Sequence, residues 1–220
     1  IASREHERML NNIASRAISD SKIKIDDIEG IAVTNGPGLA GALLTGVSFA
    51  KGLALGLGVK IISINHLEAH IIANLLDKPD IDYPFLCLLV SGGHTQLWLI
   101  NKLDDYILLG ETRDDAAGEA FDKGARILGL GYPGGPEIEK HAIGGNHKLV
   151  DFPRALSNSD KIEFSFSGLK TSLLYYMDSF KESPDIRFED VVASYQQAII
   201  DSLINKIKLA TEITGVNTIA

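Results

Sequence analysis

The sequence predicts an α/β protein, because strand-like and helix-like segments alternate along it. Short apolar runs end at glycine, proline or asparagine, whereas longer segments repeat apolar residues at helical spacing. The order strand, helix, strand, helix in the first part is typical of α/β folds. With 220 residues, 45% of them hydrophobic and 23% charged, the chain can form one sizeable domain or two small ones with a real core.

The first part is expected to begin with a helix that Ser3 caps. Glu5 and Glu7 then lie in the first turn, where acidic side chains favour the helix dipole. A short buried strand, a long apolar helix and a second strand follow, and the next helix carries two histidines. The expected ranges of the two strands and of the long helix between them are 30–34, 59–64 and 39–57.

From Pro84 onward the pattern changes to a hairpin followed by helices. "PFLCLLV", the turn "SGGH" and "TQLWLI" predict two antiparallel strands, and "YILLGE" predicts a third. Helices are expected over residues 117–128, 136–143, 168–177 and 189–214. We therefore expect a boundary near residue 80 and two parts, 1–80 and 81–220. Because the chain starts at Ile1 and stops within the strand-like "VNTIA", we expect a longer protein that has further elements at both ends.

Composition and charge narrow the classes of function. No apolar run approaches the roughly 20 residues of a membrane span, so no membrane is expected as a partner. The single cysteine, Cys87, lies in the apolar run "FLCLLV". No disulfide framework is therefore expected, and a cytoplasmic location with Cys87 in the core is favoured. The net charge of −8 argues against nucleic-acid binding by this chain alone, unless a local basic face or a partner supplies the charge.

Two glycine-rich motifs resemble nucleotide-binding loops but fail the test of context. "GPGLAG" (36–41) lies between a strand and a helix, yet the next strand ends in "SINH" without the acid that binds a ribose. A tight turn that lets the helix pack closely is therefore favoured. "FSGLKT" (166–171) lacks the first glycine of a P-loop.

Three other motifs leave two interpretations open. The "SGGH" turn exposes backbone N–H groups that suit an anion, but a plain hairpin turn uses the same residues. "GYPGGP" (131–136) ends in a proline that opens a helix, and its glycines permit close approach of a ligand. Asp115, Glu119 and Asp122 occupy neighbouring helical positions, where a solvated face is the favoured interpretation.

The segment "NHLEAHI" (65–71) carries the candidate metal ligands. His66 and His70 are four residues apart and share one face of a helix, as two ligands of one metal ion require. Glu68 lies about 200° around the helix from His66, away from this face, so the zinc-protease arrangement is not expected. A third ligand is needed, and His94, His6 or a residue outside the chain are the alternatives.

Five motifs together resemble the TsaD family of tRNA threonylcarbamoyladenosine synthesis, once labelled O-sialoglycoprotein endopeptidases. The resemblance runs from Ser3 to the last residue, and "FSFSGLKT" resembles the bacterial and organellar branch. The motifs are "VTNGPGLAGALLTGVSFAKGLA", "INHLEAHI", "LLVSGGHTQL", "DDAAGEAFDKGARILGLGYPGGP" and "FSFSGLKT".

The resemblance implies a fold of the actin, Hsp70 and sugar-kinase superfamily, with two α/β lobes and a ligand cleft between them. Residues 1–80 would then belong to the N-terminal lobe and 81–220 to the C-terminal lobe. The implied reaction transfers threonylcarbamoyl from threonylcarbamoyl-AMP to the exocyclic amine of adenosine 37, in tRNAs that read codons beginning with A. Implied partners are tRNA, a paralogous subunit that forms a heterodimer with the chain, and a small ATPase subunit.

The resemblance also implies site residues. His66 and His70 match the ligands of one iron or zinc ion, whose third ligand is an aspartate beyond Ala220. No activated nucleophile is evident, which agrees with direct transfer. The residues that match the family's substrate-binding positions are, for the phosphate side, Leu89, Val90, Ser91, Gly92 and Gly93 and, for the nucleoside side, Asp122, Gly135 and Glu139.

Several family elements are absent from this sequence: an opening strand and phosphate hairpin, and a glycine-rich loop with an asparagine. We therefore expect the 220 residues to be inactive alone. The basic residues that could contact tRNA are Arg113, Lys123, Arg126, Lys140, Arg154 and Lys170. A sugar-kinase-like or acetate-kinase-like phosphotransferase of the same superfamily, a silent scaffold and, least favoured, a metalloprotease are the alternatives.

Overall fold

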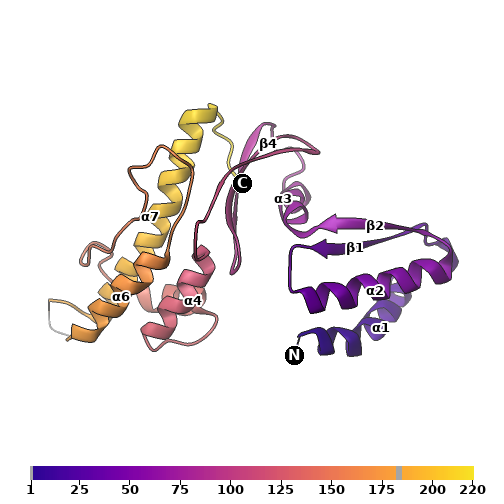
Figure 1. The fold of residues 1–220 in the computed structure, drawn as a ribbon, viewed down its shortest axis with the longest axis horizontal. Helices are drawn as coiled ribbons and strands as arrows, with labels where there is room; N and C mark the ends of the chain where they lie inside the picture. The colour runs from indigo at the N-terminus through magenta and orange to yellow at the C-terminus, as the bar shows by residue number, and fades with distance from the viewer. Residues whose placement is uncertain (1, 182–184) are drawn as a thin grey trace. The chain divides into compact units, whose positions relative to one another are not determined.

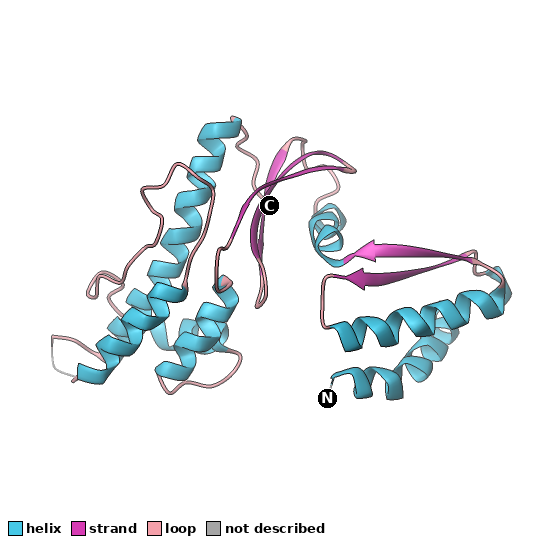
Figure 2. Cartoon of the chain, in the orientation of Figure 1, coloured by secondary structure: helices cyan, strands magenta, loops and turns pink. Residues whose placement is uncertain are grey.

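The computed structural model describes residues 2–181 and 185–220, and it divides into two compact units, Ile1–Pro79 and Asp80–Ala220. Both units mix helices and strands (Figure 2), as the α/β prediction requires. The division falls next to the expected boundary near residue 80. Assignment of the units to two lobes of a larger fold stays a prediction.

The first unit is a β-α-β arrangement with two further helices. Strands β1 and β2 pair in parallel, and α2 connects them. In Figure 1, α2 lies along this strand pair and α1 lies against α2. Helix α3 begins directly where β2 ends, at the carboxyl end of the strands. The elements are α1 (Ala2–Ser21), a short 3-10 turn (Ile25–Asp27), β1 (Gly30–Gly36), α2 (Ala40–Leu57), β2 (Lys60–Asn65) and α3 (His66–Asp77).

One expectation for the first unit is wrong, and one helix bears on another. Ser3 is not a cap, because α1 begins at Ala2 and Ser3 lies inside the helix. Helix α2 is long and apolar enough to cross a membrane, with a mean hydropathy of 1.5 over its 18 residues, of which 11% are buried. It is the one such helix in the described residues. This is weak evidence for a membrane, because helices that cover a sheet share this composition, and α2 does contact β1, β2 and α1.

The second unit contains an antiparallel sheet in the order β3-β4-β5. The predicted hairpin is confirmed, with Val90 opposite Thr95 at its tip. Ile219 pairs with Leu86 in parallel on the outer edge of β3, and Phe164 bridges Thr112 just beyond β5. The elements are β3 (Phe85–Val90), β4 (Thr95–Lys102), β5 (Asp105–Glu111), α4 (Ala117–Ile127), α5 (Gly134–Ala142), α6 (Ser167–Ser179) and α7 (Phe188–Thr214).

The core of this unit lies between the sheet and the helices. Helix α7 carries the most buried residues of any described helix, and Tyr195 in its middle is fully buried. Cys87 is buried in β3, as predicted. One expectation is wrong: α5 begins at Gly134, so Pro136 lies within the first turn instead of opening the helix. A proline is tolerated there because the first N–H groups of a helix have no partner within the helix.

Candidate functional site

The two histidines of "NHLEAHI" come together on the first turns of α3. Asn65 caps this helix, since its Oδ1 accepts hydrogen bonds from the N–H groups of Leu67 and Glu68 at 2.9 and 3.3 Å. The helix therefore starts at His66, and His70 follows one turn later. Their Nε2 atoms lie 3.3 Å apart, their ring centroids are 4.5 Å apart, and both side chains are exposed.

This spacing fits two ligands of one metal ion. Two imidazole nitrogens bound to a tetrahedral zinc lie about 3.3 Å apart, given Zn–N bonds of roughly 2.0–2.1 Å. The two Nε2 atoms already have this separation. Over residues 2–181 and 185–220, however, no group of three His, Cys, Asp or Glu side chains is placed to hold a metal. His6 therefore does not complete the pair within the first unit, and His94 lies in the second unit.

Glu68 does not take the place of the general base of a zinc protease. Because α3 is helical from His66, Glu68 lies about 200° around the axis from His66 and about 200° from His70. The histidine face and the side chain of Glu68 therefore diverge, as the sequence predicts. A protease mechanism that uses this helix is not supported.

The loop at the tip of the β3–β4 hairpin is organised by Ser91. Its Oγ accepts hydrogen bonds from the N–H groups of Gly93 and His94 at 3.3 and 3.0 Å, and its own N–H donates to the carbonyl of His94. Gly92 and Gly93 are exposed. Leu89 is buried beneath this loop, whereas Val90 is 42% exposed. The tip thus presents backbone and small side chains to solvent on a fixed strand pair.

Helix α4 begins against this hairpin. The N–H of Gly118 donates to the carbonyl of Ser91 at 3.2 Å, and the N–H of Ala117 donates to Oγ1 of buried Thr95 at 2.8 Å. A Cβ at Gly118 would lie 2.5 Å from the carbonyl oxygen of Ser91, so only glycine permits this approach. The positive end of the α4 dipole therefore lies beside the loop, which suits an anionic ligand. No sequence pattern predicts this role of Thr95 as an acceptor at the start of α4.

The nucleoside-side residues lie where α4 meets the start of α5. Oδ1 of Asp122 accepts a hydrogen bond from the N–H of Gly134 at 2.7 Å. A Cβ at Gly134 would lie 2.5 Å from the Cα of Asp122, whereas a Cβ at Gly135 would meet nothing within 4 Å. Packing therefore explains the glycine at 134 but not the one at 135. Glu139 is exposed on α5.

The acidic residues near α4 are not a simple solvated face, contrary to the favoured interpretation. Asp115 precedes the helix, which begins at Ala117. Lys123 contacts Asp115 at 2.7 Å and Glu119 at 2.8 Å, and these hydrogen bonds raise the pKa of Lys123. Oδ2 of Asp115 is buried without a hydrogen-bond partner among the described residues.

Asp114 is a structural residue that the sequence reasoning missed. It accepts hydrogen bonds from the hydroxyls of Ser165 and Ser167 and from the N–H groups of Phe166 and Ser167. Partial burial acts to raise the pKa of Asp114, but these hydrogen bonds outweigh it and lower the pKa. Asp114 thus ties the start of α6, and with it the "FSFSGLKT" segment, to the loop before α4. No local pattern in the sequence predicts these hydrogen bonds, because Asp114 lies about 50 residues before the serines that donate to it.

The whole chain, residues 1–220, matches the family described as TsaD, tRNA N6-adenosine threonylcarbamoyltransferase. The chain belongs to the TsaD family. Membership agrees with the mixed α/β architecture of both units and with the actin, Hsp70 and sugar-kinase-like fold class expected from the motifs.

Curated members of the TsaD family are similar along almost the entire chain. The tRNA N6-adenosine threonylcarbamoyltransferases of Kosmotoga olearia and Thermosipho africanus are 51% and 48% identical, each over all of this chain. That of Clostridium botulinum (strain Hall) is 46% identical over 93% of it. The aligned regions cover 65%, 66% and 61% of those proteins, so the chain spans just under two thirds of their length.

One solved structure, YeaZ from Pseudomonas aeruginosa, aligns with 47% of this chain and 53% of its own, at 12% identity and a TM-score of 0.36. This similarity is too low to carry an argument. The candidate site residues are divided between the two units. The histidine pair belongs to the first unit, and the hairpin loop and the α4–α5 junction belong to the second.

Proposed function

We propose that the protein to which this chain belongs transfers a threonylcarbamoyl group from threonylcarbamoyl-AMP to the exocyclic amine of adenosine 37. The substrates are tRNAs that read codons beginning with A. The observation that carries this proposal is the family match over residues 1–220, supported by about 50% identity to proteins named for this activity. The reaction forms a C–N bond to the amine and breaks the bond between the carbamoyl carbon and the phosphate oxygen. AMP leaves, and the amine loses a proton.

The hairpin loop supplies the phosphate side of this site. Gly92 and Gly93 are exposed at the tip and Ser91 is half-buried, beside the first turn of α4. The N–H groups of Gly93 and His94 already donate to Ser91, which leaves the N–H of Gly92 to donate to a ligand. A fixed N–H dipole of this kind stabilises negative charge that grows on a leaving group, without reorganisation during the reaction. Ser91 keeps the loop in shape, because its hydroxyl oxygen accepts two of the loop's N–H groups.

The nucleoside part of the donor lies at the α4–α5 junction in this proposal. Gly135 offers a place where a ligand can approach the backbone, since no protein atom lies near its missing side chain. Asp122 keeps the loop before Gly135 in position through its hydrogen bond to Gly134. Glu139, exposed one turn further along α5, is within the same surface region.

His66 and His70 would hold one iron or zinc ion, with a further ligand from outside these 220 residues. Such an ion, when bound, supplies Lewis-acid polarisation and orientation of a carbonyl group. The chain's own contribution is the rigid placement of the two nitrogens by the Asn65-capped helix. Partners in the proposal are tRNA, a paralogous subunit in a heterodimer and a small ATPase subunit, all in the cytoplasm.

The test uses the full-length gene in cells depleted of the native protein. Mass spectrometry of tRNA nucleosides is expected to show loss of threonylcarbamoyladenosine on depletion and its return on rescue. His66→Ala is expected to abolish the rescue and to lower the metal content of the purified protein. Glu68→Gln is the matched control on the same helix, and it is expected to rescue fully, whereas a metalloprotease would need this residue. Unchanged modification on depletion, in an organism with a single copy, refutes the assignment.

A further inference from the structure

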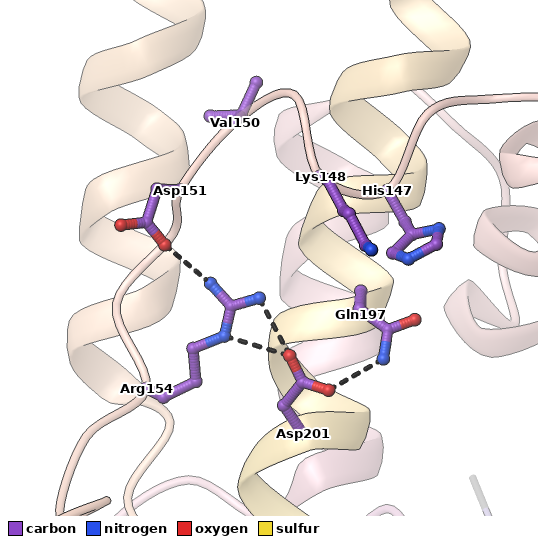
Figure 3. Close-up of a pocket in the computed structure, with 7 residues that line it drawn as sticks. All are labelled: His147, Lys148, Val150, Asp151, Arg154, Gln197 and Asp201. Carbon is purple, nitrogen blue, oxygen red and sulfur yellow. Dashed lines mark hydrogen bonds and ion pairs between the residues drawn. The ribbon is translucent and has the colours of Figure 1, made fainter.

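A polar pocket of about 370 Å³ lies between the middle of α7 and the loop that follows α5 (Figure 3). None of its residues belongs to the candidate site described above. Its size lies within the range of small-ligand pockets, and all but one of its lining residues, Val150, carry a polar or charged group. The lining residues are His147, Lys148, Val150, Asp151, Arg154, Gln197 and Asp201.

One wall of the pocket is a fixed network. Nε and Nη2 of Arg154 donate to Asp201 at 3.1 and 2.9 Å, and its Nη1 donates to Asp151 and to the carbonyl of Phe152. Nε2 of Gln197 donates to the other oxygen of Asp201 at 2.7 Å. Burial acts to raise the pKa of Asp201, but these hydrogen bonds and the nearby positive charge lower it. The negative charge of Asp201 is therefore balanced by Arg154, and the N–H groups of Arg154 that form these bonds are not available to a ligand.

The opposite wall carries two nitrogen groups that form no hydrogen bond with the described residues, although His147 lies close enough to Asp201 to influence its pKa. In the described part of the chain, no hydrogen bond or ion pair engages Nζ of Lys148, and no hydrogen bond engages the ring of His147. Both side chains are exposed, and in Figure 3 both point toward the amide of Gln197. Oε1 of Gln197 also accepts no hydrogen bond from the described residues. The pocket thus offers a donor pair, the ammonium of Lys148 and the imidazole of His147, beside one acceptor that is free among the described residues.

The loop that carries the donor pair is itself held in place. Ser194 on α7 holds it, because its Oγ accepts a hydrogen bond from the N–H of Val150 at 3.2 Å, and its hydroxyl proton is shared between the carbonyls of Asp190 at 2.7 Å and Asn146 at 3.2 Å. The N–H of Asn146 also donates to Asp190 at 2.7 Å. His147 and Lys148 therefore sit on a backbone that is fixed on both sides, which lowers the entropic cost of binding a ligand.

We propose that this pocket binds one ribonucleotide unit of the tRNA backbone. Lys148 and His147 contact the phosphate, and Oε1 of Gln197 accepts a hydrogen bond from the ribose 2′-hydroxyl. This inference rests on the proposed function, which makes tRNA the substrate. A phosphate needs donors and positive charge, and a 2′-hydroxyl needs an acceptor within one nucleotide of it. The pocket presents both, at a size that admits a sugar phosphate.

The experiment measures binding of the anticodon stem-loop to the full-length protein by fluorescence anisotropy over a range of salt concentrations. Lys148→Ala is expected to weaken binding roughly three- to tenfold at low salt and to flatten the slope of log K against log salt by about 0.7–0.9. Lys102→Ala, which removes an exposed lysine at the end of β4, is the matched control. Gln197→Ala is expected to reduce the preference for RNA over the all-2′-deoxy stem-loop, an effect that Lys148→Ala does not share.

Equal affinity and equal salt slope for Lys148→Ala and Lys102→Ala overturn the phosphate contact. An unchanged ratio of RNA to DNA affinity in Gln197→Ala overturns the ribose contact. Transfer of threonylcarbamoyl by the wild-type protein, together with the two proposed partner subunits, is measured in parallel. If the pocket variants behave as expected but the wild type forms no threonylcarbamoyladenosine, the proposed function fails and the RNA site stands. If the wild type modifies tRNA and the variants bind like it, the RNA site fails alone.

Discussion

Replacing Gly135 by alanine separates a ligand-binding glycine from a structural one. Gly135 and Gly134 are neighbours in the first turn of α5, and only the resemblance to the TsaD family distinguishes them in the sequence, by matching Gly135 to a substrate-binding position. In the structure, a Cβ at Gly134 would lie 2.5 Å from the Cα of Asp122 and 2.5 Å from the carbonyl oxygen of Phe121, whereas a Cβ at Gly135 would meet no atom within 4 Å. Alanine at the two positions should therefore have opposite effects on stability.

The expected magnitudes follow from this geometry. At Gly135 the backbone is helical and alanine is the better helix former, so stability should rise by up to about 1 kcal/mol. At Gly134 the backbone atoms in contact cannot move independently, and overpacking of this kind costs about 1–3 kcal/mol. The clash also displaces the N–H that donates to Asp122. In a chain of this size, 1 kcal/mol corresponds to about 2–4 °C in Tm.

The assay combines thermal unfolding with equilibrium binding of a non-hydrolysable analogue of threonylcarbamoyl-AMP to the full-length protein. Gly135→Ala is expected to unfold at or above the wild-type temperature and to bind the analogue at least tenfold more weakly, because its methyl group occupies space that the ligand uses. Gly134→Ala is expected to unfold several degrees lower. Wild-type binding by Gly135→Ala would refute its contact with the ligand, and equal destabilisation by both variants would refute the packing argument.

Three further predictions concern single side chains. Ser91→Ala removes the acceptor of two loop N–H groups, so affinity for the donor should fall roughly 5- to 30-fold with little change in Tm, and an unchanged KM contradicts this. Asp190 accepts hydrogen bonds from the N–H groups of Asn146 and Arg187, which lower its pKa to about 2. The ionised carboxylate of Asp190 therefore contributes its full stabilisation above the ordinary aspartate pKa near 3.8 and loses it as the pH falls toward 2. The Tm values of wild type and Asp190→Asn, measured as a function of pH, should therefore converge near pH 2. Tm curves that stay parallel over this range refute the prediction. Lys206→Met leaves two carbonyls without the buried ammonium that now donates to them, and unfolding in urea should show a loss of about 1–3 kcal/mol, whereas an unchanged midpoint excludes this role.

The elements with regular periodicity could be predicted from the sequence, and their ends could not. The hairpin is confirmed, because two apolar runs on either side of the "SGGH" turn are typical of paired strands, although β4 continues two residues beyond the predicted "TQLWLI". The start of α5 was placed two residues late, because proline usually opens a helix. Here the approach of Gly134 to Asp122 sets the start instead, and that contact depends on tertiary packing between two helices.

The site shows the same division between local and long-range determinants. The spacing of His66 and His70 is a property of one helix, and the structure places their Nε2 atoms at the separation that one metal ion needs. The roles of Asp114, Thr95 and Ser194 depend on segments that lie 22 to 52 residues away in the chain. No local pattern encodes such pairings, so the sequence predicts which residues are candidates but not which of them hold the loops in place.

The structure changes the prediction of which basic residues are available to contact tRNA. Six basic residues were candidates for contact with tRNA, and three of them are engaged by acids within the chain. Arg113 pairs with Glu163, Lys123 with Asp115 and Glu119, and Arg154 with Asp201. Neutralised cations release few counterions from a nucleic acid, so they add little affinity.

Among the described residues, the other three candidates form no ion pair: Arg126, Lys140 and Lys170. Lys148, which the sequence did not single out, joins them because the fixed loop holds it beside an acceptor that suits a ribose. A chain with a net charge of −8 must bind RNA through a few unpaired cations placed next to such acceptors, or through a partner. The spatial arrangement of its charges, more than their number, therefore decides where the RNA can lie.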